Sequence, residues 1–138
     1  MSGSPLSLSR REDREAALSL LYEADMTGDA LAEVTDRRFA DPDEYGTALA
    51  LGVAENVDDL DTRVDAVADD WTIARMAGID RAILRMGVWE LLHNANVPVS
   101  AVVSEAVALA EQYSTEKSAP FINGILVKIA GQVRPADG

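Results

Sequence analysis

Apolar residues recur at the spacing of an α-helix along most of the chain, and this pattern restricts the possible folds more than any other feature. Leu84, Val88, Leu91, Leu92 and Ala95 follow one another at i, i+4, i+7, i+8 and i+11, which places them on one helix face. The sustained alternation of apolar and polar residues that is typical of a half-buried strand does not occur. The sequence therefore predicts an all-α protein.

Helix start and stop signals divide this pattern into about seven helical segments. Ser9 and Glu12 form a capping box, which predicts a helix from there to about Met26. The sequence Asp41-Pro42-Asp43-Glu44 predicts the start of the longest helix, whose apolar stripe continues to Val67. Further helical segments are expected over 31–39, in a short turn after Trp71, and over 80–95, 99–113 and 118–133.

Short connections between these segments favour one compact bundle of antiparallel helices. The chain has 138 residues, which is enough for a single domain with a substantial core. We expect residues 9–133 to form this domain, with flexible tails at residues 1–8 and 134–138.

The charges of the chain are unevenly distributed. The formal net charge is −12, and residues 1–70 hold 18 acidic and 6 basic residues, whereas residues 71–138 hold 6 of each. Such an acidic chain repels nucleic acid over most of its surface. Three of the N-terminal bases, Arg10, Arg11 and Arg14, nevertheless lie within five positions at the start of the first predicted helix.

This arginine cluster is a candidate phosphate site. Positive side chains at the positive end of a helix dipole do not favour the helix, but they favour the capture of phosphate. Arg10 and Arg14 share a helix face, and we expect Tyr22 two turns further along it, where its ring could stack on an RNA base. The alternative is a solvated helix whose arginines pair with neighbouring acids.

Several kinds of chemistry find no support in the residues. The chain has no cysteine, and its single histidine, His93, has no second ligand at metal spacing, so neither a metal nor a cofactor is expected. Adjacent acids such as Asp58 and Asp59 diverge on a helix, and we predict no enzyme activity. No apolar run approaches the roughly 20 residues that span a bilayer, so a cytoplasmic protein without membrane contact is expected.

The dipeptide Asn123-Gly124 is a strong hairpin-turn signal that here lies inside a helical apolar repeat. Because a glycine within a helix costs about 1 kcal/mol relative to alanine, something must offset that cost. We assign Gly124 to close packing and Asn123 to satisfying backbone groups where the loop becomes a helix. Phe121 becomes a candidate contact residue, although its periodicity also fits an ordinary core anchor.

Several blocks of the second half follow one another in a distinctive order. They are Asp80-Arg81-Ala82-Ile83-Leu84-Arg85, Trp89-Glu90-Leu91, Pro98, Ser104-Glu105-Ala106-Val107 and Phe121-Ile122-Asn123-Gly124-Ile125-Leu126. The arginine cluster, followed by Ala17 and Leu21-Tyr22, precedes them. Together the blocks resemble the NusB family of transcription antitermination factors over about residues 10–133, while residues 28–70 match in helical pattern alone.

This resemblance implies a protein that, with the ribosomal protein NusE, binds the single-stranded boxA element of nascent ribosomal RNA and helps RNA polymerase pass terminators. It implies that the region around Asp80 faces NusE and that Phe121 lies beside the RNA. Lys117 stands where relatives often carry an acid, and it either adds a phosphate contact or alters the RNA preference. The residues predicted to contact RNA are Arg10, Arg11, Arg14, Tyr22, Lys117 and Phe121.

Two other functions fit parts of the sequence. Glu12 and Asp13 interrupt the arginine cluster, which also fits a protein-only interaction module or homodimer with weak or lost RNA binding. RNA cytosine methyltransferases can carry a similar helical domain, but nothing in these 138 residues supplies a cofactor-binding sheet.

Overall fold

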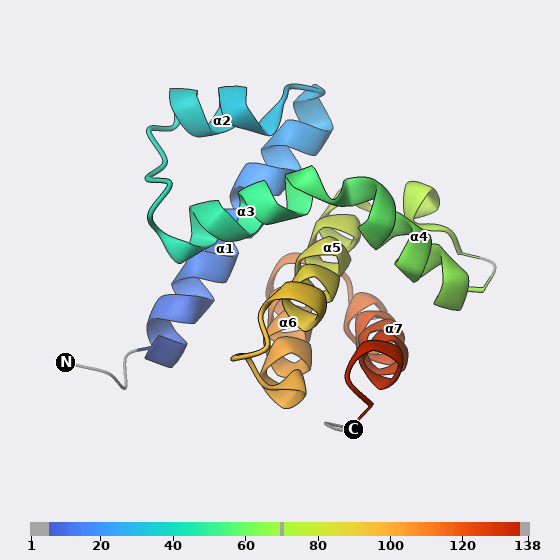
Figure 1. Ribbon diagram of the computed structural model, residues 1–138. Helices are drawn as coiled ribbons and strands as arrows, with labels where there is room; N and C mark the ends of the chain where they lie inside the picture. The colour runs from blue at the N-terminus through green and yellow to red at the C-terminus, as the bar shows by residue number, and fades with distance from the viewer. Residues whose placement is uncertain (1–5, 70, 136–138) are drawn as a thin grey trace. The chain divides into compact units, whose positions relative to one another are not determined.

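The computed structural model describes residues 6–69 and 71–135. Within these ranges the chain forms seven α-helices, one short 3-10 helix (η1) and no strand (Figure 1), which confirms the predicted all-α class. None of the described helices is long and apolar enough to cross a membrane. The elements are α1 (Leu6–Thr27), α2 (Leu31–Arg37), α3 (Tyr45–Glu55), α4 (Val57–Val67), η1 (Ile73–Arg75), α5 (Gly78–His93), α6 (Val99–Tyr113) and α7 (Ser118–Val133).

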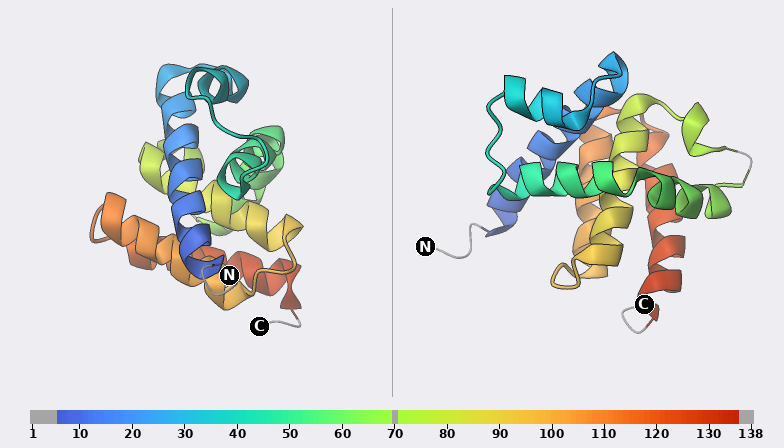
Figure 2. Two further views of the ribbon diagram at one scale, coloured as in Figure 1. Left: turned by 90° about the vertical axis from the view of Figure 1, so that its left-hand side faces the viewer. Right: turned by 45° about the horizontal axis from the view of Figure 1, so that its top comes forward.

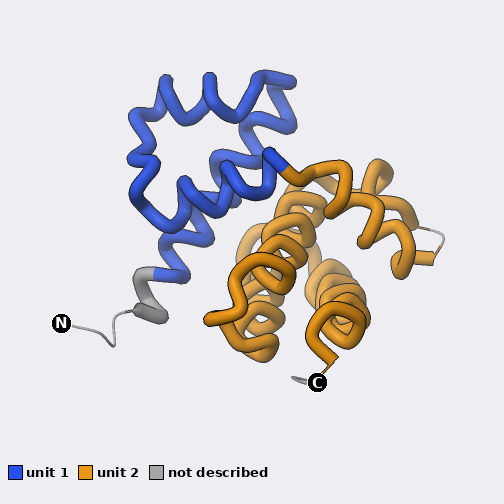
Figure 3. Tube along the Cα trace, viewed as in Figure 1, with its two compact units in different colours: residues 1–55 blue, residues 56–138 orange. Residues whose placement is uncertain are grey.

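The chain divides into two compact units, unit 1 (residues 1–55) and unit 2 (residues 56–138), which Figure 3 distinguishes by colour. The boundary falls at Asn56, whose φ of −126° and ψ of 16° interrupt the helical backbone between α3 and α4. The prediction of one long helix across this position is therefore wrong. Periodicity could not reveal the break, because the apolar stripe continues on both sides of a single non-helical residue. Each unit is described by itself below.

In unit 1, α1 packs against α3, and α2 packs against both helices. Gly46 of α3 allows the close approach of α1, because a β-carbon there would collide with the backbone carbonyl oxygen of Asp13. The buried apolar residues of this unit are Ala17, Leu18, Leu20, Leu31, Val34, Leu49, Ala50 and Val53.

Both α1 and α2 are followed by a residue with left-handed backbone. After α1 this residue is Gly28, with φ +77°, and glycine adopts that conformation without steric cost. After α2 it is Phe39, with φ 52°. The amide of Phe39 donates to the carbonyl of Asp36 and the amide of Ala40 donates to that of Thr35, which is the Schellman pattern of helix termination. A side chain at this position costs about 1–2 kcal/mol relative to glycine.

In unit 2, α5, α6 and α7 pack against one another, and α4 packs against α5 and α7. The two views of Figure 2 show α5, α6 and α7 side by side. A β-carbon at Gly87 of α5 would lie 2.9 Å from both δ-carbons of Leu126 in α7, so the two helices touch closely there. Complete burial of a leucine or isoleucine contributes about 1.5–3 kcal/mol. Large side chains buried in this unit include Leu60, Ile83, Leu84, Ile122, Leu126 and Ile129.

A bidentate ion pair links α4 to α5. The guanidinium of Arg85 donates two hydrogen bonds of 2.8 Å to the carboxylate of Asp61. Both side chains are partly shielded from solvent, and the planar fork of arginine matches the two oxygens of a carboxylate.

Arg134, which directly follows α7, caps the end of α5. Its guanidinium donates four hydrogen bonds of 2.5 to 2.9 Å to backbone carbonyl oxygens of Glu90, Leu91, Asn94 and Val97. Carbonyls near a helix end lose helical donors, although that of Glu90 still accepts from the amide of Asn94 and that of Asn94 from the amide of Val97. The sequence places Arg134 in the expected C-terminal tail, whereas the structure gives its side chain this capping role. The predicted flexibility of residues 1–5 and 136–138 concerns positions outside the described residues.

The predicted start of the first helix is wrong. α1 begins at Leu6, three residues before the predicted start at Ser9. Nothing in the sequence from Leu6 to Ser9 opposes a helix, and the segment therefore joins α1 at its N-terminal end.

The roles assigned to Asn123 and Gly124 are also wrong. α7 runs without interruption from Ser118 to Val133, so Asn123 is five residues inside the helix and exposed. A β-carbon at Gly124 would meet no neighbouring atom within 4 Å. Close packing by glycine occurs instead at Gly46 and Gly87, where no turn signal in the sequence draws attention to it.

Candidate nucleic-acid interface

Arg10 packs against its own unit. Its guanidinium carbon lies 3.5 Å from the ring centroid of Tyr45 in α3, and the side chain is half-buried. The Nη1 atom is buried without a hydrogen-bond partner. The guanidinium of Arg10 is therefore partly occupied by a cation–π contact within unit 1.

The remaining two arginines of the cluster lie on different sides of α1. Arg14 is buried, with 4% of its surface exposed, whereas Arg11 is exposed. Arg10 and Arg14 share a helix face as predicted, but that face turns into the protein. The burial of Arg14 leaves little of its side chain for an RNA strand.

Tyr22 shares the exposed face of α1 with Arg11. Eleven residues at about 100° per residue make almost three whole turns, so Arg11 and Tyr22 point in nearly the same direction, about 16 Å apart along the axis. Tyr22 is 37% exposed. The expectation that it continues the face of Arg10 and Arg14 is wrong, because Arg14 and Tyr22 differ by about 80° around the helix.

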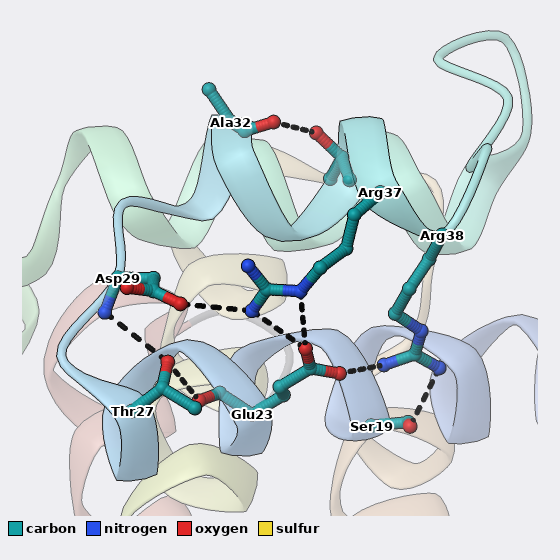
Figure 4. A network of polar contacts seen from close by, with 8 residues as sticks. Ser19, Glu23, Thr27, Asp29, Ala32, Arg37 and Arg38 are labelled. Carbon is teal, nitrogen blue, oxygen red and sulfur yellow. Dashed lines mark hydrogen bonds and ion pairs between the residues drawn. The ribbon is translucent and has the colours of Figure 1, made fainter.

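Two further arginines lie close to α1 but are neutralised within unit 1. Figure 4 shows Arg37 and Arg38, at the end of α2, reaching to the carboxylate of Glu23 in α1. Arg37 also donates to Asp29, and Arg38 to the hydroxyl of Ser19. The hydrogen bond from Arg37 is the largest influence that lowers the pKa of Glu23. These arginines are consequently weak candidates for phosphate contacts.

In unit 2, Lys117 and Phe121 form a second pair of a cation and a ring. Lys117 immediately precedes α7 with helical backbone angles and is exposed. Phe121 follows four residues later, so the two side chains lie on one helix face. Phe121 is half-buried, while the adjacent Ile122 is completely buried and fills the core position.

Asp80 is hydrogen-bonded to both ends of the connection between α6 and α7, which includes Lys117. Its carboxylate accepts hydrogen bonds from the hydroxyls of Ser114, at 2.6 Å, and Ser118, at 2.8 Å. The hydroxyls of Ser118 and Thr115 also lie 2.9 Å apart. These bonds fix the α6–α7 connection to the first turn of α5. The expectation that the region around Asp80 faces a protein partner stays a prediction.

A shallow groove of about 1160 Å³ runs between α6 and α7. Its lining includes Val99, Val103, Asn123, Val127 and Gly131. Among the described residues, no group of three or more histidine, cysteine or acidic side chains is arranged to hold a metal ion.

Comparison with known proteins places these features in a family. The sequence profile of the NusB family matches residues 11–131. The chain belongs to the NusB family. The resemblance seen in the arginine cluster and in the blocks between Asp80 and Leu126 is thereby confirmed.

Curated relatives of the NusB family match this chain over most of its length. Transcription antitermination protein NusB of Clavibacter sepedonicus is 42% identical over 130 residues, covering 88% of this chain and 95% of that protein. The protein of the same name from Leifsonia xyli subsp. xyli is 43% identical over 138 residues, covering 94% and 95%.

Solved NusB structures share the fold. NusB of T. maritima superimposes with a TM-score of 0.83 at 27% identity, covering 93% of this chain and 95% of that one. A crystal structure of the antitermination factors NusB and NusE in complex with dsRNA gives a TM-score of 0.76 at 25% identity, covering 90% and 97%.

The sequence did not identify Tyr45 and Phe39 as candidate functional residues. Tyr45 is the ring against which Arg10 packs, and sequence spacing cannot pair residues of separate helices. Phe39 is 93% exposed. Its signal in the sequence is an aromatic residue at a helix end, where a glycine is usual.

Proposed function

We propose that this NusB-family protein, together with NusE, binds single-stranded boxA-type RNA in nascent ribosomal RNA transcripts. In this role it supports processive transcription by the RNA polymerase antitermination complex in the cytoplasm, without a catalytic step of its own. The RNA-contacting side chains are Arg11 and Tyr22 in unit 1, and Lys117 and Phe121 in unit 2, with Arg10 contributing the part of its guanidinium that does not face Tyr45.

The observation that carries this proposal is the pairing of a cation with a ring on one helix face in each unit. Arg11 and Tyr22 share a face of α1, and Lys117 and Phe121 share a face at the start of α7. Single-stranded RNA is held by cations along its phosphates and by aromatic rings on which unpaired bases stack. The relative named transcription antitermination protein NusB supports the same function. The solved complex of NusB and NusE with dsRNA supports it as well.

The acidic residues of the chain explain why a protein partner is needed. With a net charge of −12, the protein gains little long-range attraction for RNA. A basic partner such as a ribosomal protein reduces this repulsion, and Asp80 at the start of α5 remains our proposed contact for it.

The test is a fluorescence anisotropy titration of labelled RNA, with and without NusE, at several salt concentrations. We expect the complex with NusE to bind boxA RNA more tightly than a scrambled RNA of equal length and composition. Equal affinity for both RNAs at matched salt contradicts the proposal.

Variants separate the two kinds of contact. Arg11→Ala and Lys117→Ala should each reduce the slope of log affinity against log salt by about 0.7, as expected for one phosphate contact to a single strand. Tyr22→Leu and Phe121→Leu keep an apolar side chain but remove the stacking ring, so they should weaken binding by about 1–3 kcal/mol without changing the slope. Arg75→Ala removes an exposed arginine of η1 and serves as the control.

A second function, a protein-only module or homodimer with weak RNA binding, is favoured by the inward orientation of Arg10 and Arg14. Under this alternative the complex with NusE forms normally but does not distinguish boxA from scrambled RNA. Light scattering of the free protein then reports a dimer whose mass is unchanged by RNA.

A further inference from the structure

Phe39 is the most exposed large apolar side chain in the described part of the protein. It is 93% exposed, compared with 52% for Met26 and Val127 and 51% for Trp71. An aromatic ring in water forgoes the stabilisation that burial would supply. Its place at this position therefore needs a reason other than packing within unit 1.

The backbone at Phe39 gives a second argument against a structural role. Phe39 occupies the left-handed position of the Schellman motif that ends α2, with φ 52°. The chain uses glycine at the corresponding position after α1, and its other non-glycine residue with positive φ in the described ranges is Asp69, a residue type that tolerates this conformation. A glycine at position 39 would suit the fold better than the phenylalanine that is present.

The segment that presents the ring is held in place. Arg37 and Arg38 immediately precede Phe39, and both bind the carboxylate of Glu23 in α1 (Figure 4). The amides of Phe39 and Ala40 are also bonded to carbonyl oxygens of α2. The ring therefore projects from an ordered helix end, and little conformational entropy is lost when it is bound.

The charges around Phe39 indicate the chemistry of the partner. Arg37 and Arg38 are already paired with Glu23 and Asp29. Five exposed acids lie close in sequence, and none of them forms an ion pair within the described residues: Glu33, Asp36, Asp41, Asp43 and Glu44. The unpaired charge of this stretch of the sequence is therefore acidic, so it repels RNA and a second copy of this acidic chain, but it attracts a basic surface.

We propose that Phe39 is the anchor of a protein-docking surface, defined by Phe39 and its five acidic neighbours, that receives a basic protein with an apolar pocket for the ring. Rigid aromatic anchors surrounded by polar residues carry most of the binding energy in many interfaces. This surface shares no residue with the set proposed to contact RNA, so either proposal can fail without the other.

The experiment has two steps and uses the full chain. First, Phe39 is replaced in cells by the photo-crosslinking residue p-benzoylphenylalanine, with Gln132, an exposed residue of α7, replaced in the same way as the control. The adducts formed on irradiation are identified by mass spectrometry. We expect a protein adduct at position 39 that is absent at position 132, mapped to a surface rich in lysine and arginine.

Second, the partner protein identified in the adduct is purified in its free form. Its affinity is measured for the wild type, for Phe39→Gly and for the double variant Asp43→Asn/Glu44→Gln. Phe39→Gly should weaken binding about tenfold or more, while its Tm is unchanged or higher, because glycine suits the Schellman position. The double variant should weaken binding at low salt and approach the wild type as salt rises. Retention of boxA RNA binding by Phe39→Gly distinguishes this surface from the RNA contacts.

Several results would overturn the proposal. They are the absence of an adduct specific to position 39, an adduct with RNA or with a second copy of this chain, and full affinity in Phe39→Gly. A large fall in the Tm of Phe39→Gly would also overturn it, because the ring would then serve the fold.

Discussion

The guanidinium of Arg10 in α1 lies over the ring of Tyr45 in α3, with its central carbon 3.5 Å from the ring centroid. Its Nη1 atom is buried and has no hydrogen-bond partner, so the ring is a principal source of compensation for the partly buried charge. A residue that the sequence assigns to RNA thus also joins two helices of unit 1.

Replacement of Tyr45 tests this contact. Tyr45→Ala should lower the free energy of unfolding by about 1–3 kcal/mol, because it removes both the half-buried ring and the cation–π contact. Tyr45→Phe keeps the ring face and the cation–π contact, so it should be more stable than Tyr45→Ala. Urea denaturation followed by circular dichroism measures both variants. A Tyr45→Ala protein as stable as the wild type would show that the stacking contributes nothing.

Two glycine-to-alanine substitutions should change stability in opposite directions. Gly124→Ala should raise the free energy of unfolding by about 0.5–1 kcal/mol, because alanine favours the helix and its β-carbon meets open space. Gly46→Ala should lower it by about 1–3 kcal/mol, because its β-carbon meets the backbone carbonyl of Asp13. The denaturant midpoints of both variants measure these changes. Destabilisation by Gly124→Ala would support the packing role that the sequence predicts for Gly124.

Arg134 should be one of the most sensitive polar residues of unit 2. Arg134→Ala removes the guanidinium donor from four carbonyl oxygens at and just after the end of α5, and it should lower the free energy of unfolding by about 2–4 kcal/mol. Arg134→Lys keeps the charge but lacks the planar fork, so it should recover part of the loss. Thermal unfolding compares the two variants. A chain truncated before Arg134 that retains full stability would contradict the capping role.

The network around Glu23 predicts a dependence of stability on pH. The hydrogen bond from Arg37, together with the charges of Arg37 and Arg38, lowers the pKa of Glu23 in the folded protein below its ordinary value of 4.5. Ionised Glu23 therefore stabilises the fold above about pH 4.5, and this contribution is lost as the pH falls through the lowered pKa. The effect is modest, because the Glu23 side chain is still 31% exposed and solvent screens its charge.

The variant Glu23→Gln measures this contribution. It should be less stable than the wild type at neutral pH, and the difference should shrink when the Tm is measured well below pH 4.5. Glu33→Gln, which changes an exposed glutamate outside the network, serves as the control. A constant difference between Glu23→Gln and the wild type at all pH values would rule out the ion pairs as its cause.

Helical periodicity predicted most elements because it reports which face of a segment is buried. The stripe from Leu84 to Leu92 lies in α5, which ends at His93 before the predicted Ala95, and Ser118 opened α7 as expected. The same signal could not locate the break at Asn56, since one non-helical residue leaves the stripe intact. It also could not show that Gly124 has free space beside it, whereas Gly87 lies against Leu126.

For the candidate site, the residue types were predictable, but their accessibility was not. The sequence alone determined an all-α chain of the NusB family, with a cluster of arginines on its first helix and Phe121 at the start of its last, because helix period and local residue order are properties of the chain itself. The tertiary structure decided that Arg10 meets Tyr45, that Arg14 is buried, and that Arg11 shares an exposed face with Tyr22. It also decided that Asp80 binds Ser114 and Ser118 and that Arg134 caps α5. The reason is physical: a side chain's exposure and hydrogen-bond partners depend on residues far away in sequence, which packing alone brings together.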